Sequence, residues 1–124
     1  MKATLQESSE NYLETILVLS RENSQVRSVD IASALDFTRP SVSVAMKKLR
    51  ENCLIEVDTD GYIVLTEKGR KIAESVYERH MLISIWLITL GVDEKIARDD
   101  ACRIEHVISE QSFLAIKRHI KSVK

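Results

Sequence analysis

The chain has 124 residues, of which 44% are apolar and 30% charged, and its formal net charge at pH 7 is −1. This composition is typical of a folded globular protein with one or two small domains and excludes a disordered chain. No apolar run approaches the roughly 18 uncharged residues of a membrane span, since the longest candidate, residues 81–90, has ten.

Three glycines and one proline in the whole chain predict few turns and therefore a mainly α fold. The N-terminal segment MKATLQESSENY has no apolar signal region, so we expect a cytoplasmic protein. Cys53 and Cys102 are the only cysteines and are expected to be thiols in a reducing compartment. Cys53 follows a predicted helix and is expected to be a small buried side chain.

Apolar residues at helical spacing predict a first helix over about residues 7–21. Ser28 is expected to cap a short second helix, which the segment DFTRP interrupts. Thr38 can cap a third helix, and Pro40 in the first turn of that helix costs no hydrogen bond. The segment LIEVDTDGYIVLT then predicts a β-hairpin with its tip at residues 58–61.

Two helices separated by a short turn and followed by a hairpin are the layout of a winged helix-turn-helix, in which the third helix enters the major groove of DNA. The third helix supports this interpretation because its apolar residues recur on one face, namely Val42, Ala45, Met46 and Leu49. Between Arg39 and Arg50 there are four basic residues and no acidic one. We therefore expect these residues to contact DNA: Arg27, Arg39, Pro40, Ser41, Ser43, Lys47, Lys48 and Arg50.

Three helices are predicted in the C-terminal part of the chain. Thr66 can cap a long helix over residues 67–90 that Gly91 ends, and a further helix is expected over about residues 93–108. A last helix is expected to follow the segment SEQS. The domain boundary is predicted to separate residues 1–72 from residues 73–124.

The segment ACRIEHVIS places Cys102, Glu105 and His106 within about one helical turn, beside the apolar stripe of the same helix. A thiolate, a carboxylate and an imidazole together suit a divalent transition metal better than magnesium or calcium. One turn rarely supplies a complete shell, so further ligands are expected from His80 on the long helix and from Glu14 with Asn11 on the first. The residues alone leave open a core histidine at position 80 and an ordinary polar helix face.

Several segments together resemble the diphtheria toxin repressor and manganese transport regulator family of metal-dependent repressors, over essentially the whole chain. The segments are ENYLETILVL, RPSVSVAMKKL, LTEKGRKIA, the RH pair of the long helix and DDACRIEHVIS. The resemblance implies an N-terminal winged helix-turn-helix domain, a C-terminal helical dimerisation domain and a homodimer on a pseudo-palindromic double-stranded DNA operator. It also implies Fe²⁺ or Mn²⁺ as corepressor, with Zn²⁺, Co²⁺ or Ni²⁺ binding in vitro.

By the same resemblance, the metal ligands are Asn11, Glu14, His80, Cys102, Glu105 and His106. Cys102 is similar to the iron-responsive branch of the family, whereas Glu14 is similar to the manganese-responsive branch. Asn11 departs from both branches, which have Met or Asp at the matching position. Ser84 and Arg98 stand where the iron-responsive branch has ligands of an ancillary site.

The sequence therefore predicts a metal-dependent transcriptional repressor of metal-ion uptake genes. One alternative is a redox-responsive winged-helix regulator that uses Cys102, and another is a helical protein-interaction module without DNA binding. An enzyme is not expected, because the chain has no Gly-rich phosphate loop, no HExxH motif and no nucleophile motif.

Overall fold

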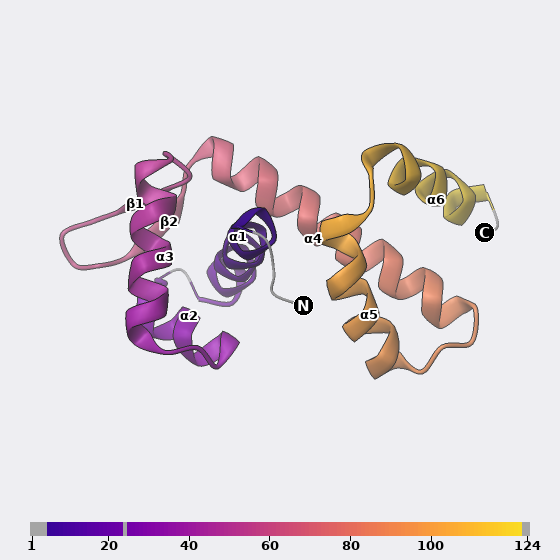
Figure 1. Cartoon of the computed structure of the whole chain (residues 1–124), viewed down its shortest axis with the longest axis horizontal. Helices are drawn as coiled ribbons and strands as arrows, with labels where there is room; N and C mark the ends of the chain where they lie inside the picture. The colour runs from indigo at the N-terminus through magenta and orange to yellow at the C-terminus, as the bar shows by residue number, and fades with distance from the viewer. Residues whose placement is uncertain (1–4, 24, 123–124) are drawn as a thin grey trace. The chain divides into compact units, whose positions relative to one another are not determined.

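The structure, a computed structural model, describes residues 5–23 and 25–122 (Figure 1). Its elements in chain order are α1 (Leu5–Glu22), α2 (Ser28–Leu35), α3 (Arg39–Glu51), β1 (Ile55–Val57), β2 (Ile63–Leu65), α4 (Glu67–Thr89), α5 (Glu94–Val107) and α6 (Glu110–Ser122). The chain forms two compact units that divide between Glu74 and Ser75, so that α4 contributes to both. Among the described residues, no helix has the length and apolar character needed to cross a membrane.

The first unit is built around the apolar faces of α1, α2 and α3. Its α1 packs against α2 and β2, while α3 packs against α2 and β1. The predicted stripe of α3 is confirmed, with Val42, Met46 and Leu49 buried. Burial of such side chains supplies most of the stability that holds a helix in place.

The turn between α2 and α3 contains a left-handed residue and the predicted N-cap of α3. Asp36 adopts a left-handed conformation with φ of 56°, and its N–H donates to the carbonyl of Ala32. The Thr38 side chain then accepts a hydrogen bond from the Ser41 N–H at 3.3 Å, which confirms Thr38 as the N-cap of α3.

Two predictions about single residues in this unit are wrong. Ser28 is the first helical residue of α2 and not its cap; Arg27 is the N-cap, and its N–H donates to the Asp30 carboxylate at 2.8 Å. Cys53 is exposed and not buried, because it takes the left-handed conformation, φ 61°, with which the chain leaves α3. Leu54 is the buried residue at this point, and its N–H donates to the Leu49 carbonyl.

The predicted hairpin is confirmed as an antiparallel pair in which Ile55 lies opposite Leu65. Its inner side chains are buried, whereas Glu56 and Val64 face solvent. The N–H of Ile63 donates to the Val26 carbonyl at 2.7 Å. This bond attaches the hairpin to the segment that leads into α2.

The second unit contains the last part of α4 together with α5 and α6 (Figure 1). Its core cluster consists of Ile83, Ala101 and Phe113, one residue from each helix. Asp93 caps α5 through hydrogen bonds from the next helical turn. The last helix begins at Glu110, inside the segment SEQS and not after it, because the Ser109 hydroxyl accepts from the Ser112 N–H and starts the helix there.

Gly69 allows the first turn of α4 to lie directly on the main chain before the hairpin. A Cβ atom at this position would lie 2.0 Å from the Leu54 carbonyl oxygen, which is backbone and cannot move aside as a side chain could. The hydroxyl of Thr66 accepts from the Gly69 N–H at 3.1 Å and donates to the Cys53 carbonyl at 2.8 Å. The start of α4 is therefore attached to the end of α3.

Replacing Gly69 with alanine is expected to lower the free energy of unfolding by about 1–3 kcal/mol, the usual cost of overpacking a closely packed position. Elsewhere in a helix, the same change adds roughly 0.5–1 kcal/mol of stability. Chemical denaturation of Gly69→Ala, with Ser75→Ala on the exposed side of α4 as control, measures the difference. A Gly69→Ala protein more stable than the wild type would contradict this close approach.

Candidate metal centre and nucleic-acid interface

Glu105 is a fully buried carboxylate at the C-terminal end of α5, with no exposed surface. It follows Ala97 and Ala101 at four-residue steps, so the three residues form one ridge of the helix. The sequence predicted that Glu105 lies beside the apolar stripe; the structure places it within the buried row. A carboxylate is rarely buried unless a specific partner compensates for its lost hydration.

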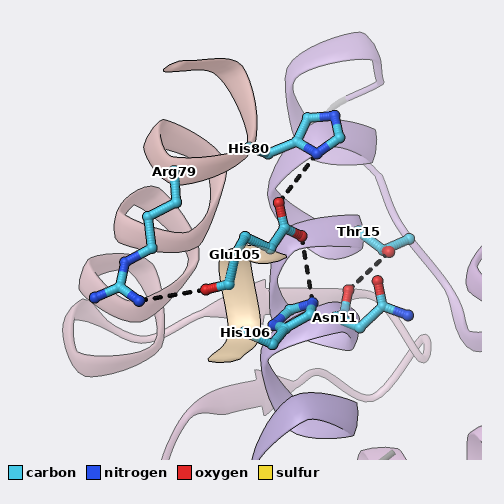
Figure 2. A network of polar contacts seen from close by, with 6 residues as sticks. All are labelled: Asn11, Thr15, Arg79, His80, Glu105 and His106. Carbon is cyan, nitrogen blue, oxygen red and sulfur yellow. Dashed lines mark hydrogen bonds and ion pairs between the residues drawn. The ribbon is translucent and has the colours of Figure 1, made fainter. Parts of the chain in front are cut away.

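Two imidazoles meet this carboxylate from two helices (Figure 2). His80 Nδ1, from α4, lies 3.0 Å from Glu105 Oε2, and His106 Nε2, from α5 itself, lies 3.3 Å from Glu105 Oε1. The side chains of His80 and His106 are 25% and 9% exposed. Each carboxylate oxygen therefore has an imidazole nitrogen beside it, in surroundings with little water.

The donor set of this cluster fits a divalent transition metal. Neutral imidazole and carboxylate are ligands that Mn²⁺, Fe²⁺ and Zn²⁺ accept, whereas magnesium and calcium prefer sites built from oxygen alone. A divalent ion also supplies the positive charge that a buried carboxylate requires. Glu105, His80 and His106 could therefore hold such an ion within the second unit.

The other three predicted ligands, Cys102, Asn11 and Glu14, come from α5 and α1. Cys102, one turn before Glu105 on α5, is exposed. Asn11 and Glu14 belong to α1 in the first unit, where both are partly buried. The main-chain carbonyl of Asn11 accepts a hydrogen bond from the Thr15 hydroxyl at 2.8 Å, which does not involve the Asn11 side-chain amide (Figure 2).

One residue of the centre was missed by the sequence reasoning. Arg79 Nη1 donates to the main-chain carbonyls of Glu105, at 3.3 Å, and Ile108, at 3.0 Å. Its guanidinium reaches the backbone side of Glu105, opposite to the carboxylate (Figure 2). In the sequence, Arg79 stands out only as the neighbour of the predicted ligand His80. That position does not predict a contact with main-chain carbonyls.

The nucleic-acid interface predicted for α3 is an exposed surface in the first unit. All the predicted contact residues of this helix are exposed: Arg39, Pro40, Ser41, Ser43, Lys47, Lys48 and Arg50. Arg39, Ser43 and Lys47 follow one another at four-residue steps and form one ridge. The neighbouring ridge carries Val44, which is 56% exposed and has no hydrogen-bonding group.

Arg27 lies apart from this ridge, at the start of α2. Its guanidinium lies over the ring of Tyr62, 4.5 Å from the ring centroid. Tyr62 immediately precedes β2, so this cation–π contact joins Arg27 to the base of the hairpin. A DNA contact by Arg27 would accordingly belong to the hairpin side of the unit.

The first unit is a winged helix-turn-helix with an exposed basic helix, and the second is a helical unit with a buried carboxylate between imidazoles. These features define a DNA-binding regulator with a candidate metal centre. The chain belongs to the iron-dependent repressor family. Residues 4–64 match the model of its N-terminal DNA binding domain, and residues 66–124 match the model of its metal binding and dimerisation domain.

Curated relatives and solved structures agree with this membership. The transcriptional regulator MntR of Escherichia coli O6:H1 is 37% identical over 108 residues, which cover 87% of this chain and 70% of that protein. The iron-dependent repressor IdeR of Mycobacterium bovis is 36% identical over 107 residues, which cover 86% of this chain and 46% of IdeR. The solved structure of the manganese regulator SloR superposes with a TM-score of 0.81 at 28% identity, covering 91% of this chain and 53% of SloR.

The chain thus spans about half the length of IdeR and of the solved SloR chain. The comparisons confirm the predicted family resemblance and the mainly helical, winged helix-turn-helix fold. The two domain descriptions name DNA binding, metal binding and dimerisation, in agreement with the predicted operator, Fe²⁺ or Mn²⁺ ion and homodimer. The named relatives are transcriptional regulators.

Replacing Arg39 and Lys47 together with alanine removes both cations from one ridge of α3. We expect duplex binding to weaken at least tenfold, and the slope of log affinity against log salt to fall by about 0.9 for each phosphate that the helix no longer neutralises. Fluorescence anisotropy at several salt concentrations measures both quantities. Replacing the exposed Arg118 and Lys121 of α6 together with alanine is the matched control, and an unchanged salt slope in the Arg39 and Lys47 variant would contradict a phosphate-binding role for this ridge.

Proposed function

We propose that the chain is a metal-activated transcriptional repressor of metal-ion uptake genes, with Fe²⁺ or Mn²⁺ as corepressor. One observation carries this proposal: the buried Glu105 carboxylate lies between His80 and His106, within the part of the chain that matches a metal binding domain. Two relatives support the choice of ion: SloR is a manganese regulator, and IdeR is an iron-dependent repressor.

The proposed ligand set joins two parts of the chain. His80, Cys102, Glu105 and His106 come from the proposed metal-binding and dimerisation domain, residues 73–124. The remaining ligands, Asn11 and Glu14, come from the proposed DNA-binding domain, residues 1–72. Both lie on α1, three residues apart and therefore on one side of the helix.

The regulatory mechanism follows from this division. A bound divalent ion would supply the positive charge that the carboxylates of Glu14 and Glu105 lack. Glu105 and the two histidines would hold it from the second unit, and Asn11 with Glu14 would hold it from the first. The arrangement of the units that completes the ligand set is then favoured over other arrangements, which is a population shift and not a new fold.

Two copies of the chain would present two recognition helices to a pseudo-palindromic operator. Exposed apolar side chains in the second unit support a dimer through this part of the chain: Met81, Ile85, Ile88, Leu90, Val107 and Leu114. We propose that the protein acts in the cytoplasm as a regulator and not as an enzyme, as its relatives are regulators.

Replacing Glu105 with glutamine keeps the shape of the side chain but removes its charge. We expect Glu105→Gln to bind Mn²⁺ and Fe²⁺ at least 100-fold more weakly, because a buried neutral amide cannot balance the ion. Operator binding should then no longer depend on the ion. Isothermal titration with each metal, and operator binding with and without a chelator, measure the two effects.

Glu110→Gln, an exposed position at the start of α6, is the control for the loss of one acidic residue. Wild-type operator affinity that does not change on chelation would overturn the corepressor role. Release by oxidant without any effect of metal would instead select the redox-responsive alternative based on Cys102. Absence of duplex binding under all these conditions would select the interaction-module alternative.

Asn11 is expected to set the metal preference. Asn11→Asp adds a negative charge and a hard oxygen donor, which should shift the preference toward Mn²⁺ relative to Fe²⁺ and Zn²⁺. Competition titrations with pairs of metals measure the ratio of affinities, which we expect to change by about tenfold. Asn23→Asp, just after α1, is the matched control. An unchanged ratio in Asn11→Asp would exclude Asn11 from the ligand set.

A further inference from the structure

Two neighbouring residues of α4 contact the same residue of α5 at opposite ends. His80 lies against the carboxylate of Glu105, while Arg79 donates to its main-chain carbonyl (Figure 2). The carboxylate would hold the ion, and the carbonyl belongs to the helix that carries the carboxylate. Arg79 therefore contacts the main chain of the proposed ligand Glu105, and His80 contacts its side chain.

The Arg79 contacts supply hydrogen-bond donors at the C-terminal end of α5. The last four carbonyls of a helix have no intrahelical donor, and α5 ends at Val107. Arg79 Nη1 supplies a donor to the Glu105 carbonyl at 3.3 Å and to the Ile108 carbonyl at 3.0 Å. A cation at this end of a helix also interacts favourably with the helix dipole. The turn that carries Glu105 and His106 is thus held by a side chain from another helix.

The guanidinium is itself restrained by α6. It lies over the ring of Phe113, 5.4 Å from the ring centroid, and Phe113 is a buried member of the core cluster. An ion pair between Lys117 and Glu78, 2.9 Å long, joins the same two helices, α6 and α4. Arg79 therefore has a defined orientation between three helices.

We propose that Arg79 is a positioning residue for the metal centre: it fixes the last turn of α5 and thereby the directions of Glu105 and His106. This inference rests on the proposed function. The orientation of the guanidinium matters because a cation paired with the carboxylate would compete with the ion. The bonds of Arg79 to main-chain carbonyls instead stabilise the turn from the backbone side of Glu105.

Arg79→Met keeps a long side chain but removes both hydrogen bonds and the charge. We expect Co²⁺ to bind roughly 10- to 100-fold more weakly, the usual effect of removing an outer-shell partner of a ligand. The visible absorption spectrum of bound Co²⁺ should also change, because it reports ligand geometry. Arg79→Lys, which keeps a cation and a donor, should recover part of the affinity and move the spectrum toward that of the wild type.

Arg103→Met, at an exposed position on α5, is the matched control and should bind Co²⁺ as the wild type does. Thermal unfolding of each variant is measured in parallel without metal. A lower unfolding temperature with wild-type Co²⁺ affinity and spectrum would show a purely structural role for Arg79 and overturn the inference. Should Arg79→Met fail to fold, Arg79→Gln, which loses the charge and is too short to reach both carbonyls, takes its place: weaker Co²⁺ binding supports the inference, and wild-type binding with a wild-type spectrum overturns it.

Failure of the inference is distinguishable from failure of the proposed function. If Glu105→Gln also binds Co²⁺ as tightly as the wild type, the metal centre itself is wrongly assigned and the positioning role falls with it. If Glu105→Gln loses Co²⁺ while Arg79→Met retains wild-type affinity and spectrum, the metal centre stands and only the role of Arg79 is overturned.

Discussion

The buried carboxylate of Glu105 is the constraint on which the second unit depends. Removing a carboxylate from water costs several kcal/mol unless charge and hydrogen bonds compensate. His80 and His106 each place a nitrogen beside one of its oxygens, and Arg79 holds the main chain behind it. The register of α4 against α5 therefore has to satisfy polar contacts as well as the packing of Ile83, Ala101 and Phe113.

The long helix α4 contributes residues to both units of the chain. Its first turn contacts the main chain that leads into the hairpin, through Thr66 and Gly69, and its later turns supply Arg79 and His80. A metal-dependent repressor needs an ion whose binding free energy differs between two arrangements of its units, since equal affinity for both would shift nothing. The proposed ligand set, divided between α1 and the second unit, would meet that requirement, because it would be complete in one arrangement and incomplete in others.

Local signals in the sequence predicted most of the fold. The spacing of apolar residues located α3, and Thr38 and Thr66 mark the starts of α3 and α4 because a cap acts within one turn. The exposure of Cys53 was missed because a left-handed residue after a helix is usually glycine, and the sequence offers cysteine there. The family resemblance named Glu105 as a ligand. The burial of Glu105 and its contact with Arg79 depend on how α4 packs against α5. A pattern within one helix cannot predict that packing.

The proposed ligands also show why the choice of ion depends on residues far apart in the sequence. With Asn11 neutral, the carboxylates of Glu14 and Glu105 alone balance the two positive charges of the ion, and the histidines add none. A thiolate from Cys102 would bring a third negative charge, which a soft bond to Fe²⁺ or Zn²⁺ compensates better than a bond to Mn²⁺. In the proposed ligand set, a neutral Asn11 would leave the thiol of Cys102 as the ligand that separates iron from manganese.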